Sequence, residues 1–259
     1  MKRKRTKHRL PTGSILGTFG KGRDGSVSVN FGTSGGPNCD IGCELHPIHG
    51  NEVGCYAERV EIRGDRIHLN DKLKRHQAMP AFQVCGRALL ELQELERRGV
   101  VVPWLRISTN GSLPKPAKVR GDKLFATQFR TLLDYCRQHG IPVHCPVESH
   151  KKARFYRALA GDLAVVREST QSDKRFLTAT GAVSRVAGTA DQSRIERVEA
   201  ARELAADRRE STGRKCIVCP AVTNSFAARR DSSLLNARAK CGYCDMCSRT
   251  DCDVVFPRH

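Results

Sequence analysis

The chain has 259 residues, of which 39% are hydrophobic and 28% charged, enough for one large α/β domain or for a domain with a small metal-bound appendage. Its 45 Lys and Arg residues outnumber 27 Asp and Glu, giving a formal net charge of +18 spread along the sequence. No run approaches the ~20 apolar residues of a membrane-spanning helix, so we expect no membrane partner. The charge predicts a polyanionic partner, most simply nucleic acid; the alternative is a basic surface without a dedicated ligand.

Three segments are expected from the distribution of charge and cysteine. Residues 1–24 are predicted to form a basic N-terminal arm, residues 25–213 an α/β core, and residues 214–259 a Cys-rich metal-binding segment. The basic start of the chain is not followed by the apolar stretch of a secretory signal. We therefore expect a cytoplasmic protein, in which clustered cysteines bind metals more readily than they form disulfides.

Strand and helix patterns alternate along the predicted core. The first strand is predicted at residues 26–31, where polar and apolar residues alternate, and amphipathic helices follow at residues 81–98 and 122–139. Further elements are expected at residues 100–107, 141–145, 163–168 and 176–180 (strands), after Ser149 and at residues 191–209 (helices). This alternation predicts parallel strands joined by helices. We expect a partial or closed α/β barrel, with a doubly wound open sheet as the alternative.

Three cysteines and two histidines are grouped on the loop at residues 38–58, directly after the first predicted strand: Cys39, Cys43, His46, His49 and Cys55. The carboxyl end of a strand in an α/β protein is where sites are built. Three thiolates can hold three irons of a four-iron cluster and leave the fourth iron open. A fourth ligand from either histidine would instead close the site, as in a structural zinc centre. The spacing leaves both interpretations open.

The motif Cys39-x3-Cys43 and the later Cys55-Tyr56-Ala57 resemble the cluster loop of the radical SAM superfamily, particularly members carried by phages and plasmids. The resemblance implies a [4Fe-4S] cluster on the three cysteines that binds S-adenosyl-L-methionine, and an α/β barrel around it. The chain departs from the usual C-x3-C-x2-C spacing, because eleven residues separate Cys43 from Cys55.

The resemblance also implies which loops would contact the cofactor. The predicted cofactor-binding residues are Tyr56, Asn110, Gly111 and Ser112. The ends of the next two predicted strands carry further polar candidates: His144, Glu148, Ser149, Arg167, Glu168 and Ser169. The alternative for each is a cap, a turn residue or a solvated charge, and Ser149 is fully explained as a helix N-cap. His144 and Cys145 are neighbours on a strand, so they point to opposite faces and cannot form a catalytic pair.

A second cysteine cluster lies near the C-terminus, and its six cysteines exceed the four that one zinc or one cubane needs: Cys216, Cys219, Cys241, Cys244, Cys247 and Cys252. Two residues between cysteines allow both sulfurs to bind one metal ion. By resemblance to phage and plasmid proteins that combine a Cys-Pro with a C-x2-C-x2-C motif, the favoured ligands are Cys219, Cys241, Cys244 and Cys247, with Cys216 as the substitute. Zinc and an auxiliary iron–sulfur cluster are equally compatible with this spacing. We expect a structural role for this centre.

Two functions follow from these patterns. The first is a radical SAM-like iron–sulfur enzyme that modifies or acts on nucleic acid. The second is a non-enzymatic nucleic-acid-binding protein of a mobile element, stabilised by zinc or by iron–sulfur clusters. They differ at the first cysteine loop, because ligation by His46 or His49 would leave no open coordination position.

Overall fold

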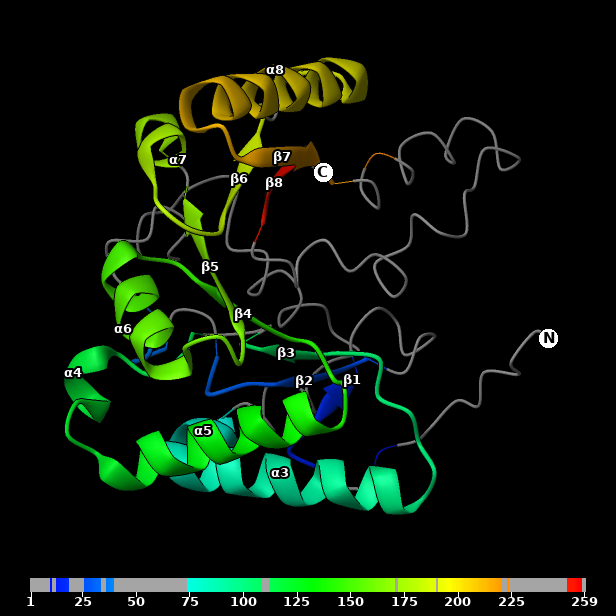
Figure 1. Ribbon diagram of the computed structural model, residues 1–259, viewed down its shortest axis with the longest axis vertical. Helices are drawn as coiled ribbons and strands as arrows, with labels where there is room; N and C mark the ends of the chain where they lie inside the picture. Colours follow the sequence, from blue (N-terminus) through cyan, green and yellow to red (C-terminus); the bar gives the residue numbers. More distant parts are fainter. Residues whose placement is uncertain are drawn as a thin grey trace. The chain divides into compact units, whose positions relative to one another are not determined.

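The computed structural model describes residues 10, 13–18, 26–33, 36–39, 74–108, 112–170, 172–189, 191–219, 223 and 251–257. The chain divides into two compact units, Met1–Val166 (unit 1) and Arg167–His259 (unit 2). Both units combine parallel strands with helices, which confirms the predicted α/β class (Figure 1). Within these ranges, no helix has the length and apolar character needed to cross a membrane.

Unit 1 is built from β1 (Gly17–Thr18), β2 (Val27–Val29), α3 (Ala81–Arg97), β3 (Leu105–Ile107), α4 (Pro116–Val119), α5 (Lys123–Gln138), β4 (Val143–Val147) and α6 (His150–Ala160). Its strands lie in the order β1-β2-β3-β4. The short β1 runs antiparallel to β2, whereas β2, β3 and β4 are parallel. The parallel strands therefore place the loops that follow them at one common edge.

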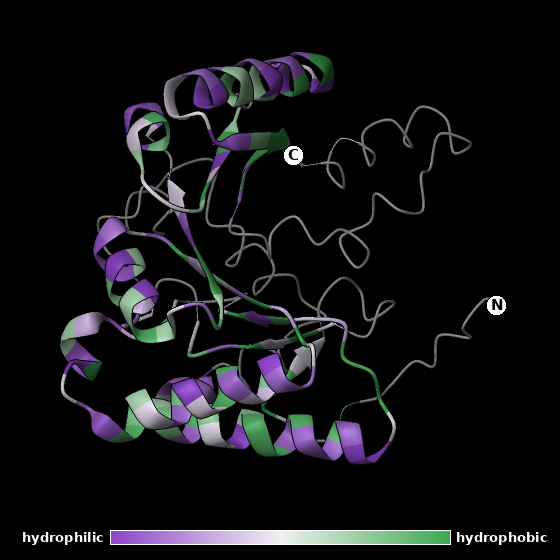
Figure 2. Cartoon of the chain, viewed as in Figure 1, coloured by the Kyte–Doolittle hydropathy of each residue, from purple (hydrophilic) through white to green (hydrophobic). Residues whose placement is uncertain are grey.

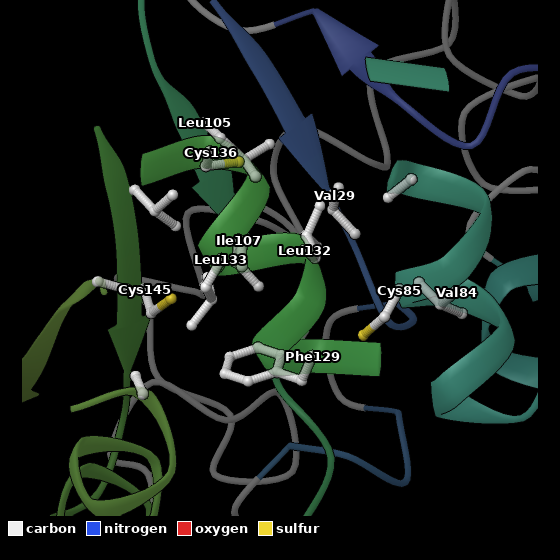
Figure 3. Close-up of a cluster of buried hydrophobic side chains, with 14 of the residues drawn as sticks. Val29, Val84, Cys85, Leu105, Ile107, Phe129, Leu132, Leu133, Cys136 and Cys145 are labelled. Atoms are coloured by element: carbon white, nitrogen blue, oxygen red, sulfur yellow. The ribbon is translucent and has the colours of Figure 1, made fainter. Parts of the chain in front are cut away.

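One face of this sheet forms a large apolar core with α3 and α5. The two helices pack against each other (Figure 1), and hydrophobic and hydrophilic residues alternate along both (Figure 2). Figure 3 shows side chains from both helices meeting those of the strands: Val29, Val84, Cys85, Leu105, Ile107, Phe129, Leu132, Leu133, Cys136 and Cys145. The helices begin and end as predicted, because Asp122 caps α5 through Phe125 N and glycines in the left-handed region follow α3 and α5.

The opposite face of the same sheet is polar. Since side chains alternate along a strand, the residues between the core positions of β2, β3 and β4 point away from α3 and α5. The register pairs Ser28 with Arg106, and Arg106 with His144, so these three form one row across three parallel strands. Trp104 lies beside this row, with its ring centroid 6.5 Å from that of His144. We call Ser28, Asn30, Trp104, Arg106, Ser108 and His144 the polar face of unit 1.

The segment before β1 is anchored by a single carboxylate. Ile15 and Leu16 are buried, although they fall within the range predicted to be a basic arm. Glu91 of α3 accepts hydrogen bonds from Ile15 N (2.7 Å), Leu16 N (3.1 Å) and the Ser14 hydroxyl. These bonds satisfy backbone N–H groups of the segment that leads into β1.

Unit 2 contains β5 (Val165–Thr170) from Arg167 onward, α7 (Asp173–Thr178), β6 (Val183–Ala187), α8 (Arg194–Thr212), β7 (Lys215–Val218) and β8 (Cys252–Pro257). The strands lie in the order β5-β6-β8-β7, and all of these pairs are parallel. Ser193 begins α8 with a capping box to Glu196, and Gly213 ends it in the left-handed conformation. Both β7 and β8 lie within the segment predicted to be a Cys-rich extension.

Some predicted elements differ from those observed. Residues 176–180, expected as a strand, include the end of helix α7, which Ser172 caps, and the true strand β6 follows five residues later. A short apolar run does not distinguish a buried strand from a helical turn, which explains this error. In residues 100–107, strand pairing is limited to Leu105–Ile107. The strands predicted at residues 26–31, 141–145 and 163–168 agree with β2, β4 and β5 within a few residues, whereas β1, β7 and β8 were not predicted.

Candidate functional site

Cys39 lies at the carboxyl end of β2, where the sequence places the first metal ligand. Its backbone N–H donates to Gly36 O (2.9 Å), and the neighbouring Asn38 side chain donates to Phe31 O (2.9 Å). Its thiol lies 3.8 Å from Thr33 O. Cys39 is half-buried, whereas the other described cysteines are buried. Its thiol is therefore both positioned by the loop and accessible to a ligand.

The chain returns to the same place after residue 73. His76 Nδ1 lies 3.1 Å from Asn30 O, and Gln77 Oε1 accepts from Thr33 N (3.3 Å) and from the Thr33 hydroxyl (3.2 Å). A Cβ atom at Gly36 would lie 3.0 Å from the backbone oxygen of Thr33, so a side chain there would crowd this turn. Both flanks of residues 40–73 are thus held at the carboxyl end of β2.

Several predicted site residues lie outside the described residues: Cys43, His46, His49, Cys55, Tyr56, Asn110, Gly111, Cys241, Cys244 and Cys247. Their roles as ligands or cofactor contacts stay predictions. Ser112, from the predicted cofactor loop, is described and is partly buried after β3.

Lys152 connects the loops that follow the three parallel strands of unit 1. Its side chain is only 2% exposed, and its ammonium donates to Asn38 O (2.5 Å), Leu113 O (2.9 Å) and Glu148 Oε1 (2.5 Å). Asn38 follows β2, Leu113 follows β3, and Glu148 follows β4. We call Lys152 and these three acceptors the strand-end clamp. A buried ammonium is tolerated because a carboxylate neutralises it and two carbonyl groups complete its hydrogen bonds.

The sequence did not single out Lys152. A lysine in the first turn of a helix usually extends into solvent, and its acceptors are backbone carbonyls on loops far away in sequence. The one available signal was Glu148 four residues earlier, a common spacing for surface ion pairs. Ser149 acts as the predicted N-cap, since its hydroxyl accepts from Lys152 N (3.4 Å).

Ser108 follows β3 in a conformation that is unusual for a residue with a side chain. Its φ is 64°, in the left-handed region, and it is 5% exposed. Its backbone N–H donates to Val29 O (2.7 Å), whereas its buried hydroxyl has no hydrogen-bond partner among the described residues. Strained conformations of this kind persist where the surrounding structure fixes them, and they concentrate at functional sites.

The candidates at the end of β5 have structural partners within unit 2. Arg167 donates to Val183 O and Cys252 O, each at 2.9 Å, and so ties β5 to its neighbours. Glu168 forms a two-pronged ion pair with Arg175 of α7 (2.7 and 2.9 Å). The hydroxyls of Ser169 and Ser184 lie 3.1 Å apart. These contacts give Arg167, Glu168 and Ser169 a structural role in unit 2.

Cys216 and Cys219 are placed differently from each other. Cys216 lies on β7 within the apolar cluster of unit 2, and burial raises the pKa of its thiol to about 12. Cys219 follows β7 and donates its N–H to Val255 O (2.7 Å), extending the pairing with β8. Residues three apart on a strand point to opposite faces. Cys216 thus belongs to the apolar cluster, and the role of Cys219 as a ligand stays a prediction.

The three cysteines on the core side of unit 1 are unsuited to ligation. Burial raises the pKa of the Cys136 thiol to about 12 and raises the pKa values of Cys85 and Cys145 further. The thiolate is the form that binds metals, so these side chains behave as apolar core groups. In the part of the chain that the structure describes, no three His, Cys, Asp or Glu side chains are grouped to hold a metal ion.

The chain was compared with protein-family models, with curated proteins and with solved structures, and none of them matches it.

Proposed function

We propose that this chain is a radical SAM-like iron–sulfur enzyme that acts on nucleic acid in the cytoplasm, built as a partial α/β barrel with a Cys-rich metal-binding extension. The observation that supports it most directly is the position of Cys39. It lies at the carboxyl end of the first parallel strand, it is the accessible thiol among the described cysteines, and both flanks of residues 40–73 are held beside it. That is where a cluster loop would have to lie.

The donor chemistry fits an iron–sulfur cluster as far as the described residues extend. Thiolates are the preferred ligands of such clusters, and Cys39 is half-buried, whereas the core thiols are buried. Cys43 and Cys55 would complete the set, with Tyr56, Asn110, Gly111 and Ser112 around S-adenosyl-L-methionine. When bound, the cluster and this cofactor would supply the radical chemistry, and the protein would supply orientation and a dry cavity.

The strand-end clamp prepares this edge for a ligand. It fixes the backbone of Asn38, one residue before Cys39, to the loop after β3 through Leu113 and to the end of β4 through Glu148. Ligands placed on rigidly held loops lose less freedom on binding. Three strand ends are thus held in fixed relation around the proposed cluster position.

The second cluster fits a structural centre better than a catalytic one. Cys219 is anchored to β8 through Val255, at the end of a four-residue strand. With Cys241, Cys244 and Cys247 it would hold zinc or an auxiliary iron–sulfur cluster. The net charge of +18 supports nucleic acid as the substrate of the first site.

The test is anaerobic purification with iron, sulfide and zinc quantified, followed by EPR of the reduced protein with and without S-adenosyl-L-methionine. We expect about four irons per chain at the first site and a signal that shifts when the cofactor is added. Cys39→Ala should remove those irons. The matched control is Cys136→Ala, which removes a buried thiol and should keep the iron. Zinc without iron, even after reconstitution, would end the enzyme proposal.

The competing proposal is a non-enzymatic nucleic-acid-binding protein with two closed metal centres. The basic composition and the placement of Cys219 on the framework of unit 2 favour it. It predicts zinc or inert clusters, binding that weakens steeply with salt, and no effect of S-adenosyl-L-methionine on that binding.

A further inference from the structure

The proposed cluster does not use the polar face of unit 1, which extends over three adjacent parallel strands. The sheet of an α/β unit with helices on both faces is apolar on both faces. Here the second face carries a cation, an imidazole, an indole, an amide and two hydroxyls in register on adjacent parallel strands. Four members are at most 5% exposed: Ser28, Asn30, Ser108 and His144.

We propose that the polar face binds a nucleotide together with its phosphate. The inference deepens the proposed function and rests on it for the source of that nucleotide, a nucleic-acid strand. Arg106 stands at the centre of the row, between Ser28 and His144, and is itself only partly buried. A guanidinium flanked by a hydroxyl and an imidazole is suited to a phosphate group, which accepts several hydrogen bonds at once.

Trp104 supplies the second part of the site. Its ring lies next to that of His144, and its side chain precedes that of Arg106 by two residues on the same face of β3. Aromatic side chains stack on nucleic-acid bases, and this stacking tolerates any base because every base has a flat π surface. An indole beside a guanidinium can therefore hold a base and the phosphate attached to it.

Ser108 completes the face at its carboxyl end. Its buried hydroxyl has no hydrogen-bond partner among the described residues, and its left-handed backbone is held by the bond to Val29 O. A buried hydroxyl without a partner is unfavourable, which a ligand hydroxyl or phosphate oxygen would relieve. From Trp104 to Ser108 the face extends over about 13 Å at the usual rise per strand residue. It ends at the edge where the strand-end clamp lies.

The experiment uses the anaerobically purified full chain and a fluorescein-labelled single-stranded oligonucleotide, as RNA and as DNA. Fluorescence anisotropy gives the affinity, and the emission of Trp104, the single tryptophan of the chain, reports whether the ligand reaches the polar face. We expect binding to change that emission. Arg106→Gln should weaken binding about tenfold or more and lower the salt dependence by about one phosphate contact.

The matched control is Arg154→Gln, which removes the same charge from an exposed position of α6 and should change affinity less than twofold. Ser108→Ala, which deletes one oxygen, should weaken binding with an unchanged circular dichroism spectrum and keeps the test valid if Arg106→Gln fails to fold. Competition by a nucleoside monophosphate would identify a free nucleotide as a sufficient ligand; competition by oligonucleotides alone would identify the strand.

Three results would overturn the inference: equal losses in the Arg106 and Arg154 variants, an unchanged Trp104 emission at saturation, or equal competition by a nucleoside without phosphate. These results are separate from the fate of the proposed enzyme. A chain that contains iron and responds to S-adenosyl-L-methionine but fails this test loses the nucleotide site alone. A chain that passes without iron loses the enzyme proposal alone.

Discussion

The two units of this chain stabilise similar strand–helix arrangements by different means. Unit 1 buries large apolar side chains, with Phe125, Phe129 and Leu132 of α5 all fully covered. Unit 2 has a smaller apolar cluster, made mainly of alanine and valine around Phe176, and α8 is visibly more hydrophilic than α3 or α5 (Figure 2). Unit 2 buries fewer large apolar side chains than unit 1, and it contains buried ion pairs in addition.

Asp253 of β8 is the centre of those ion pairs. It is fully buried and accepts from Arg208 Nε (2.9 Å), Arg214 Nε (3.0 Å) and Val183 N (2.9 Å). Arg208, also fully buried, stacks over the ring of Phe176 at 5.4 Å. The stability of unit 2 therefore depends on a few buried charged groups, each of which needs its partner. The stability of unit 1 is distributed over many apolar contacts.

The largest effect is therefore expected from Asp253→Asn. The change keeps the side-chain volume but leaves two arginines, one fully buried, without their carboxylate, which should lower the free energy of unfolding by about 3–5 kcal/mol. Hydrogen–deuterium exchange should show faster exchange in peptides of α8 and β8. Asp162→Asn, at an exposed ion pair with Arg137, should cost no more than about 0.5 kcal/mol. Equal costs would refute the central role of Asp253.

Truncating a side chain in the apolar core of unit 1 tests whether that core stabilises the unit. Leu132→Ala removes a fully buried side chain of α5 (Figure 3) and should cost about 3 kcal/mol, by lost burial and by the cavity left behind. Faster exchange is expected in peptides of α3 and α5. Leu124→Ala, on the same helix but 60% exposed, should change stability by no more than about 0.5 kcal/mol. A Leu132 variant as stable as the Leu124 variant would contradict an apolar core centred on α5.

Among the described residues of unit 1, the strand-end clamp uses the same chemistry as unit 2, a buried ion pair. Lys152→Met keeps the length of the side chain but removes three hydrogen bonds and leaves Glu148 partly buried without its cation. We expect a loss of about 2 kcal/mol in urea denaturation. Lys151→Met, at the exposed neighbouring position, is the control and should be nearly neutral.

A second substitution shows whether the loss comes from the ion pair. Adding Glu148→Gln to Lys152→Met should recover part of the lost stability, because the carboxylate that Lys152 neutralised is then removed as well. A double variant that is no more stable than Lys152→Met alone would contradict this account of the clamp.

The elements of unit 1 were easier to predict than those of unit 2, and the reason lies in the same contrast. Long apolar stripes with clear ends, as in α3 and α5, mark helices directly in sequence. The strands β6, β7 and β8 carry serine, arginine, lysine, cysteine and aspartate in place of an apolar run. The residues from Cys216 to Cys219 were interpreted as a metal-binding motif and not as part of a strand. Strands held by side chains from distant elements leave little local pattern.

The candidate site was predictable only in part for a related reason. The position of Cys39 followed from a strand and the loop after it, which are local features. Lys152 and Ser108 could be recognised only from the structure. Two acceptors of Lys152 are backbone carbonyls of distant loops, and Ser108 is unusual in its positive φ angle. The polar face required the register of three strands, which no single segment contains.

The smallest predicted effect is the loss of folding stability at high pH, which should differ between the two units because they contain different numbers of buried thiols. Burial raises the pKa of Cys136 in unit 1 from 9.0 to about 12, and raises those of Cys85 and Cys145 as well. Unit 2 has two such thiols, Cys216, whose pKa is also raised to about 12, and Cys252, whose pKa burial raises too. A folded-state pKa above the unfolded value stabilises the fold fully below pH 9. That contribution is lost as the pH rises from 9 to 12, because only the unfolded chain ionises there.

Between pH 9 and pH 10 each such thiol should cost about 1 kcal/mol of stability, so unit 1 should lose more than unit 2. Urea denaturation at pH 8, 9 and 10 measures the total, and hydrogen exchange, corrected for its intrinsic pH dependence, divides it between the units. Cys136→Ala isolates one thiol and should make the decline between pH 9 and pH 10 shallower by about 1 kcal/mol. A variant with the wild-type decline would show that this thiol already ionises in the folded protein, and the apolar character assigned to the core around α5 would then be wrong at that position.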